Sequence, residues 1–205
     1  MAAQIVRVDP VAPDERLLRE AAHVLRRGGL VAFPTETFYG LGAAALDRAA
    51  VRRVFEIKGR PASMPLLVLI DAAARLRHVV DDIPQRAQPL IDRHWPGPLT
   101  LVFRAAAHVP SDLTAGTGTV GVRVPSHPVP RVLVTQLDDA ITAPSANRTG
   151  AAPPTTAEAV LAYFGDVLDL ILDAGPTAGG EPSTVVDVTV DPPRIIRQGA
   201  ITLTP

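Results

Sequence analysis

The sequence predicts an α/β protein, in which short strands alternate with helices. Three observations carry this prediction. Short apolar runs alternate along the chain with segments of helical periodicity. The run LLVLI at 66–70 is continuous, as is typical of a central strand covered on both faces. The candidate strands 184–189 and 194–197 lie close enough to pair as a hairpin across residues 191–193.

Capping signals predict the helices. Asp14 and Asp47 are typical N-cap residues placed before amphipathic segments, and Gly28–Gly29 ends the first helix. Thr155, with Glu158 three residues later, forms a capping box. The expected helices are 14–27, a segment after 47, 84–94, and 155 to about 164.

Apolar runs and period-two alternation predict the strands. Pro34 ends the second strand, and the residues that follow it are expected to form a loop. The expected strands are 4–8, 30–33, 66–70, 99–103, 119–124, 140–142, 170–173, 184–189 and 194–197.

Length, charge and composition exclude several classes of protein. The 205 residues are enough for one domain with a buried core, expected over 1–205. The 20 basic and 21 acidic side chains balance, whereas nucleic-acid-binding proteins usually carry a basic excess. Cysteine is absent, which excludes disulfide scaffolds and thiolate chemistry. No signal-peptide pattern and no long apolar run is present, so a cytoplasmic location without a membrane contact is expected.

Two residue types occur once each. All basic residues but Lys58 are arginines, and the sole asparagine is Asn147. The abundance of Ala, Arg, Pro and Gly indicates a codon bias that replaces exposed Lys and Asn. Arg cannot replace the compact charge of Lys at every site, so these two residues are candidates for function.

Several common functional motifs are absent or lack the structural context that they require. The segment 116–121 matches G-x-G-x-x-G, but a strand follows it where a dinucleotide-binding fold needs a helix. The histidines lie far apart, without the spacing of metal ligands. No nucleophile elbow and no Walker A pattern occurs.

Four loops next to apolar strands are rich in hydroxyls, Gly and Pro, namely 34–40, 58–61, 144–147 and 179–184. In open α/β sheets, ligands bind among loops at strand ends. Cationic candidates are Lys58, Arg60, Arg123 and Arg197. Neutral donors are Thr35, Thr37, Thr119, Ser145, Asn147 and Ser183. This set suits a polyphosphate and a carboxylate, where catalysis is mainly positioning and charge neutralisation.

Several segments carry a resemblance to a known family. They are FPTETFYGLG at 33–42, KGRP at 58–61, PL at 65–66, WPGPLTLVF at 95–103, VGVRVPSHP at 120–128, APSANRTG at 143–150 and PSTVVD at 182–187. In this order they closely resemble the threonylcarbamoyl-AMP synthase family of the YrdC type, over a core of about 15–200. The chain resembles the short form of that family, which has a single domain.

The resemblance implies one α/β domain with a twisted mixed sheet flanked by helices and an open, positively lined cavity. It implies an enzyme, a nucleotidyltransferase. Its substrates would be L-threonine, bicarbonate or CO2, and ATP with Mg2+ bound through the nucleotide; its products would be threonylcarbamoyl-AMP and pyrophosphate. This is the first step of the t6A modification at position 37 of tRNA. Partners would be the downstream t6A-transfer proteins, with a possible weak tRNA contact.

Site residues carry over by motif. Positions matching the threonine site are Thr37, Leu69, Arg123, Ala143 and Ser183. Positions matching the ATP site are Lys58, Arg60, Met64, Thr119, Ser145, Asn147 and Arg197. Lys58 and Arg60 are the expected catalytic residues.

Two positions depart from the family pattern. Met64 stands where Asn is usual, and Leu69 stands where His is usual. A backbone contact to ATP would survive at Met64, whereas Leu69 cannot supply an imidazole to threonine. Leu69→His is therefore expected to tighten threonine binding.

Two other functions stay open. The first is a carbamoyl-adenylate-handling module, as in hydrogenase-maturation carbamoyltransferases, which carry Cys-rich zinc segments that this chain lacks. The second is an RNA-binding or ribosome-maturation protein, which would favour a basic surplus and aromatic stacking platforms. Aromatic residues make up 4% of this chain.

Overall fold

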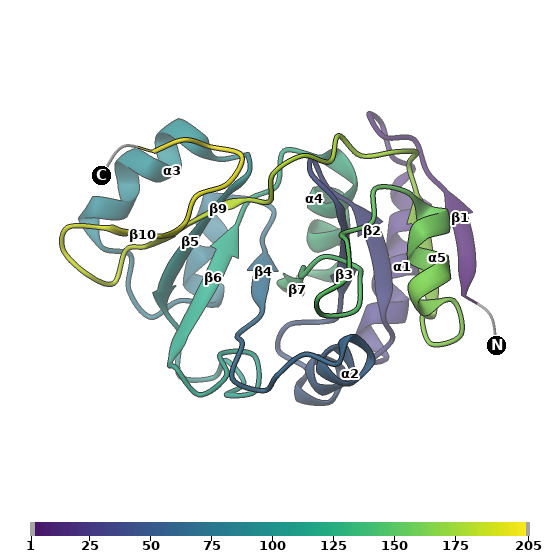
Figure 1. The fold of residues 1–205 in the computed structure, drawn as a ribbon, viewed down its shortest axis with the longest axis horizontal. Helices are drawn as coiled ribbons and strands as arrows, with labels where there is room; N and C mark the ends of the chain where they lie inside the picture. Colours follow the sequence, from purple (N-terminus) through teal and green to yellow (C-terminus); the bar gives the residue numbers. More distant parts are fainter. Residues whose placement is uncertain (1–2, 204–205) are drawn as a thin grey trace.

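The computed structural model describes residues 3–203, so the expected domain over 1–205 extends beyond it by two residues at each end. Within this range, the strands form two hydrogen-bonded sheets that lie side by side along the long axis of the molecule (Figure 1). The strands are β1 Gln4–Arg7, β2 Val31–Pro34, β3 Tyr39–Gly42, β4 Leu67–Leu69, β5 Leu99–Arg104, β6 Thr119–Arg123, β7 Ile141–Thr142, β8 Leu170–Asp173, β9 Thr184–Asp187 and β10 Arg194–Arg197.

Both sheets are mixed. The smaller sheet has the order β1-β8-β2-β3, and the larger has the order β10-β9-β5-β6-β4-β7. Parallel pairs such as β4 with β6 alternate with antiparallel pairs such as β5 with β6. Isolated bridges from Gly40 to Ser145 and from Ala44 to Ile141 link the two sheets. The predicted α/β class with a mixed sheet is confirmed, and the hairpin of β9 and β10 forms as expected.

Two of the α-helices in the described range begin at the caps that the sequence predicts. The α-helices are α1 Glu15–Arg26, α2 Arg48–Lys58, α3 Gln88–His94, α4 Pro128–Leu137 and α5 Ala157–Phe164, with 3-10 turns η1 Ala73–His78 and η2 Gln85–Ala87. Asp14 and Asp47 cap α1 and α2 as predicted. The predicted cap of α5 is wrong by one residue, because the hydroxyl of Thr156, not Thr155, accepts from the Ala159 amide.

One strand and one α-helix were not expected. Strand β3 occupies part of the predicted loop and pairs with β2 in a hairpin. Its glycines weaken a strand pattern, but the Phe33 ring lies so close that a Cβ at Gly42 would meet it at 2.7 Å. Helix α4 begins with prolines, which are tolerated in the first turn because the amides there have no partner within the helix.

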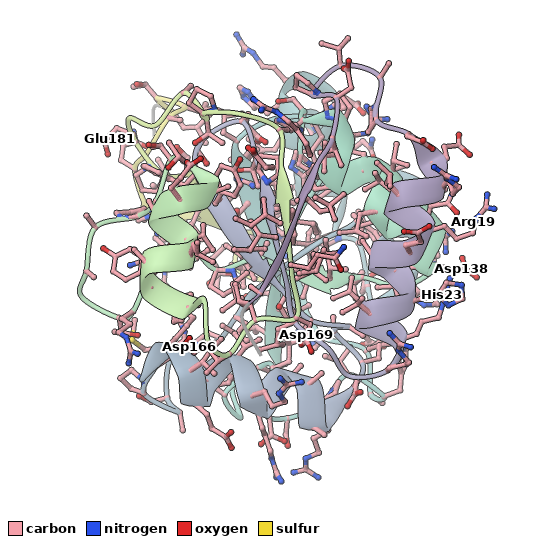
Figure 2. All side chains as sticks on the ribbon, turned by 90° about the vertical axis from the view of Figure 1, so that its right-hand side faces the viewer. Arg19, His23, Asp138, Asp166, Asp169 and Glu181 are labelled. Atoms are coloured by element: carbon pink, nitrogen blue, oxygen red, sulfur yellow. The ribbon has the colours of Figure 1, made fainter. Side chains whose placement is uncertain are left out.

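Two apolar cores lie on opposite faces of the sheets. Along β2, Val31 and Phe33 pack with α1 and α4, whereas Ala32 between them packs with α2 and α5. On α1, Leu18 and Ala21 face inward, while Arg19 and His23 point outward (Figure 2). Among the described residues, no helix combines the length and the apolar character that crossing a bilayer would require.

The larger sheet is covered along one face and only in part on the other. Val120 and Val122 of β6 point into the core that α2 and α3 cover. The alternate residues Thr119, Gly121 and Arg123 line a cavity on the other face. Helix α4 reaches only as far as β4 on this side, so the rest of the face stays open. The fold thereby leaves one face of the larger sheet free to bind a ligand.

Candidate active site

The cavity on this open face has a volume of about 470 Å³, which lies within the range of small-molecule sites. Strands β5, β6 and β9 form its floor with alternate side chains. Its described lining holds three guanidinium groups and no carboxylate. The polar lining residues are Thr35, Thr37, Arg60, Ser63, Thr100, Thr119, Arg123, Ser145, Ser183 and Arg197. Such a lining suits an anionic ligand.

A glycine keeps the floor low at its centre. A Cβ at Gly121 would approach the Thr100 side chain to 3.2 Å and Leu67 to 3.5 Å, on the strands to either side. The flanking Thr119 and Arg123 then rise on either side of an open floor. The position therefore makes room for a ligand rather than satisfying a backbone angle.

A bulge directs Arg197 toward the cavity. In the β9–β10 hairpin, Ile195 pairs with Val186 and Arg197 with Val185, so Ile196 has no partner in the register. As a result, both Ile196 and Arg197 line the cavity, which consecutive residues of a regular strand cannot do. The same strand edge thus presents an apolar and a cationic group to one site.

Two of the three arginines are held by backbone carbonyls. Arg60 donates from Nε to the Met64 carbonyl (3.0 Å) and from Nη2 to that of Pro65 (2.9 Å), which ties the loop after α2. Arg197 donates from Nε and Nη2 to the Ser183 carbonyl, at 3.2 and 2.7 Å. Burial lowers the pKa of both groups, and the charge of Arg123 lowers that of Arg197 further.

The third arginine is different. Arg123 is 4% exposed, and its side chain donates no hydrogen bond to any residue between 3 and 203. Its nearest anion is Glu36, with 3.8 Å between Nη1 and Oε1. Burial lowers the pKa of Arg123, and the Glu36 charge opposes this. The guanidinium therefore keeps its donors for a ligand.

The cavity hydroxyls form pairs. Thr100 and Ser183 lie 2.9 Å apart between their oxygens, and Arg197 also reaches the Ser183 hydroxyl at 3.3 Å. Thr35 and Thr37 lie 3.2 Å apart in the turn between β2 and β3. Each pair offers one hydroxyl with a free lone pair or proton to a ligand.

The structure brings together all but three of the predicted site residues. Those that line the cavity are Thr37, Arg60, Met64, Thr119, Arg123, Ala143, Ser145, Ser183 and Arg197. Lys58, Leu69 and Asn147 do not line it.

The structure places Lys58 outside the cavity lining. The side chain is 3% exposed, and Nζ donates to the carbonyls of Ser145 and Asn147, both at 2.5 Å. The Lys58 carbonyl in turn accepts from the Thr149 amide at 2.8 Å. Burial, and then the charge of Arg60, lowers the pKa of Lys58 to about 8. Lys58 therefore fastens the 145–149 loop to the end of α2, and so positions Ser145 at the cavity.

Gly59 separates Lys58 from the cavity wall. It ends α2 in the left-handed conformation, with a φ of 58°. The chain reverses there, so Arg60 reaches the cavity while Lys58 stays beneath the loop.

Asn147 belongs to the same junction. Its Nδ2 donates to the carbonyls of Arg148 (2.9 Å) and Ala151 (2.7 Å), while Oδ1 is buried without a partner in the described structure. Asn147 thus braces the loop behind Ser145 and does not itself line the cavity.

The structure places Leu69 away from the cavity. It is fully buried in the core of α1 and α4, next to residues such as Phe33 and Ile141. Leu67, two residues earlier, lies on the same face and lines the cavity, but α4 covers the sheet from there on. A polar group at position 69 would therefore meet the core and not a ligand.

Sequence reasoning missed two residues. Thr100 is a single hydroxyl within the apolar run LTLVF, and its period-two position opposite Leu99 and Leu101 was the available signal. Glu36 stands in a loop already marked as polar, but nothing local indicated that it faces Arg123. Among residues 3–203, no group of three or more His, Cys, Asp or Glu side chains is placed to hold a metal ion.

Comparisons with known proteins agree with the motif resemblance. The family model for Sua5, YciO and YrdC, described as telomere recombination, matches residues 23–199. A threonylcarbamoyl-AMP synthase of Pyrococcus abyssi is 46% identical over 190 residues, which cover 93% of this chain and 56% of that protein. The chain thus spans little more than half the length of this relative.

Solved structures share the fold. The crystal structure of P. abyssi Sua5 complexed with L-threonine has a TM-score of 0.91 at 45% identity, covering 95% of this chain and 57% of that one. Escherichia coli YciO has a TM-score of 0.88 at 26% identity, covering 97% and 96%. With a family model over most of its length and these relatives, the chain belongs to the Sua5/YciO/YrdC family.

Proposed function

We propose that this protein is an L-threonylcarbamoyl-AMP synthase, which makes threonylcarbamoyl-AMP and pyrophosphate from L-threonine, bicarbonate or CO2, and ATP. The observation that carries the proposal is a cavity with three arginines, one of them with free donors, and no carboxylate in its described lining. The name of the P. abyssi relative and the threonine in the Sua5 crystal structure support it.

The threonine half of the site would lie around Arg123. A free guanidinium fork matches a carboxylate, because it can donate two parallel hydrogen bonds. Thr37 and Ser183 offer hydroxyls next to it, and the small side chain of Ala143 leaves room for the substrate.

The ATP half would lie toward Arg60 and Arg197, with Thr119 and Ser145 as neutral donors. Both arginines are already oriented by carbonyls, so their charges can meet phosphates without a large loss of side-chain entropy. Met64 contributes its carbonyl to Arg60 and its side chain to the rim of the cavity.

Mg2+ would enter with the nucleotide. The described cavity lining carries hydroxyls and guanidiniums but no carboxylate, which fits an ion held mainly by phosphate oxygens and water. When bound, the ion would supply charge neutralisation at the phosphates.

The reaction needs two anions to meet. The threonine nitrogen bonds to the carbon of CO2 and loses a proton, which gives a carbamate. A carbamate oxygen then attacks the α-phosphorus of ATP, and pyrophosphate leaves. Arg60, Arg123 and Arg197 would offset the repulsion between these groups, and Lys58 would hold the Ser145 wall in place. The product would pass to proteins that transfer the threonylcarbamoyl group to tRNA.

Pyrophosphate release tests the proposal. The protein is incubated with ATP, Mg2+, bicarbonate and L-threonine, and each component is omitted in turn. Release that requires all four is expected, and Arg123→Ala should abolish the threonine-dependent part, while Glu20→Gln on the exposed side of α1 serves as the control. Release without threonine, or with carbamoyl phosphate in its place, would contradict the proposal and favour a carbamoyl-adenylate activity.

A further inference from the structure

Glu36 occupies an unusual position beside the cavity. It lies in the turn between β2 and β3, between Thr35 and Thr37, which both line the cavity. Its own side chain lies behind the lining, and both carboxylate oxygens are buried. Turn carboxylates normally extend into solvent, so the burial of this one requires an explanation.

No described residue donates a hydrogen bond to either oxygen of Glu36. Within residues 3–203, its one cationic neighbour at ion-pair distance is Arg123, at 3.8 Å from Nη1 to Oε1. A buried carboxylate without hydrogen bonds is unfavourable, and such groups in a folded protein often serve a function.

Arg123 likewise lacks hydrogen-bond partners among the described residues. Its Nε is buried and has no partner in the part of the chain that the structure describes. Arg60 and Arg197 are each held by two hydrogen bonds to carbonyls, whereas Arg123 is held by the charge of Glu36 alone. The distance of 3.8 Å provides attraction without using a guanidinium N–H.

His127 shows that the charge of Glu36 acts locally. Burial lowers the pKa of this half-buried histidine, and the Glu36 carboxylate acts against that lowering. His127 itself caps α4, where its Nδ1 accepts from the Val129 amide at 3.2 Å. It is thus engaged elsewhere and does not replace Arg123 as the partner of Glu36.

We infer that Glu36 is the positioning residue for Arg123. It neutralises the buried guanidinium from behind and keeps its N–H donors turned toward the cavity, where they meet the carboxylate of the ligand. The identity of that ligand as threonine rests on the proposed function. The prearranged fork then binds a carboxylate without a reorientation cost.

Charge alone would predict the opposite effect, and this makes the inference testable. Removing the anion beside Arg123 should strengthen the attraction for a carboxylate if Glu36 only competes with the ligand. If Glu36 positions the guanidinium, its removal should weaken binding. The sign of the change therefore separates the two roles.

The first experiment measures binding by titration calorimetry, without turnover. L-Threonine and L-threoninamide, which lacks the carboxylate, are titrated into wild type, Glu36→Gln, Glu36→Asp and the surface control Glu20→Gln. Glu36→Gln should bind threonine roughly tenfold more weakly, in the range for residues of one coupled network. Threoninamide should bind wild type and Glu36→Gln equally, and Glu36→Asp should recover part of the loss. Unchanged or tighter threonine binding by Glu36→Gln would overturn the inference.

The second experiment needs no ligand. The Nε–H resonance of Arg123, assigned through Arg123→Lys, should be sharp in ¹⁵N-labelled wild type and in Glu20→Gln, and broadened in Glu36→Gln. An unchanged Nε–H resonance in Glu36→Gln would overturn the inference. Because no ligand is added, this outcome can be read even where the substitution disturbs threonine binding by destabilising the fold. Failure of wild type to bind threonine would instead refute the proposed function, while this resonance still tests the role of Glu36.

Discussion

At the end of α2, the buried ammonium of Lys58 donates to the carbonyls of Ser145 and Asn147. At the end of β6, the equally buried guanidinium of Arg123 donates to no residue in the described range and has only the charge of Glu36 nearby. Both cations are deeply buried, with exposed fractions of 3% for Lys58 and 4% for Arg123. Burial therefore does not separate a structural cation from a ligand-binding one, whereas the use of its donors does.

The Lys58 junction and the Arg123 side of the cavity therefore have different roles. At the junction of α2 with the 145–149 loop, the Lys58 ammonium is already hydrogen-bonded to two carbonyls, so a change there should affect stability as well as activity. The Arg123 side is unsaturated, so a conservative change there should affect ligand binding and leave stability nearly intact. Four predictions, on Lys58, Leu69, Arg123 and the pH dependence at Lys58, test this difference.

Loss of the Lys58 ammonium should have the largest effect. Lys58→Ala removes a donor from the carbonyls of Ser145 and Asn147 and leaves that of Asn147 without any, so the free energy of unfolding should fall by roughly 2–4 kcal/mol. Pyrophosphate release should fall by at least ~10²-fold, because the loop that carries Ser145 is released. Urea unfolding and the pyrophosphate assay measure the two effects.

Lys58→Arg is the sharper variant, because a planar fork does not fit between two carbonyls that hold a compact ammonium. It should also be impaired in stability and activity. Arg60→Ala should lose as much pyrophosphate-release activity as Lys58→Ala. Its loss of stability should be smaller, since Arg60 is less deeply buried. A stable and fully active Lys58→Arg would remove the distinction between the Lys58 junction and the Arg123 side of the cavity.

Leu69→His should have the next largest effect. The structure reverses the expectation that it tightens threonine binding, because the imidazole would enter the core of α1 and α4 without a partner. The free energy of unfolding should fall by roughly 2–4 kcal/mol. Leu69→Met, which conserves volume, should cost less than ~1.5 kcal/mol. A stable Leu69→His with tighter threonine binding would mean that the cavity extends under α4.

Arg123→Lys should have a smaller and more selective effect. It keeps the charge opposite Glu36 but loses the fork, so threonine affinity should fall about tenfold while stability stays within ~1 kcal/mol. Calorimetric titration and urea unfolding of the same preparation measure both quantities. A loss of stability as large as that of Lys58→Arg would show that both cations are structural.

The pH dependence at Lys58 should be the most gradual effect. Its pKa is about 8 in the folded protein and 10.5 ordinarily, so the unfolded chain binds this proton more tightly. Between these values unfolding takes up a proton, and the contribution of Lys58 to the free energy of unfolding rises with pH, by at most ~1.4 kcal/mol per pH unit. The difference between wild type and Lys58→Met, followed by urea unfolding from pH 7 to 10, should therefore grow above pH 8. A difference that is flat with pH would contradict the lowered pKa.

Much of this fold follows from local patterns. The caps Asp14 and Asp47 act on amides within three residues, and the alternation in TVGVRV separates core from cavity side chains. The hydroxyl-rich loops also gather at one cavity as expected, and the single Lys and Asn meet at one junction. These features depend on neighbours along the chain or on strand ends that must meet at one edge of a sheet.

Other features depend on segments far apart in the sequence. Packing of α4 over β4 places Leu69 in the core and leaves Leu67 at the cavity, although both have the same local pattern. The Phe33 ring leaves no room for a Cβ at Gly42 of β3, and Glu36 lies 3.8 Å from Arg123 although the two residues are far apart in the sequence. The local sequence specifies which side chains of an element share a face, but it does not specify which distant element packs against that face. Coverage is set by the packing of side chains from several elements at once, so the division between core and cavity emerged only in three dimensions.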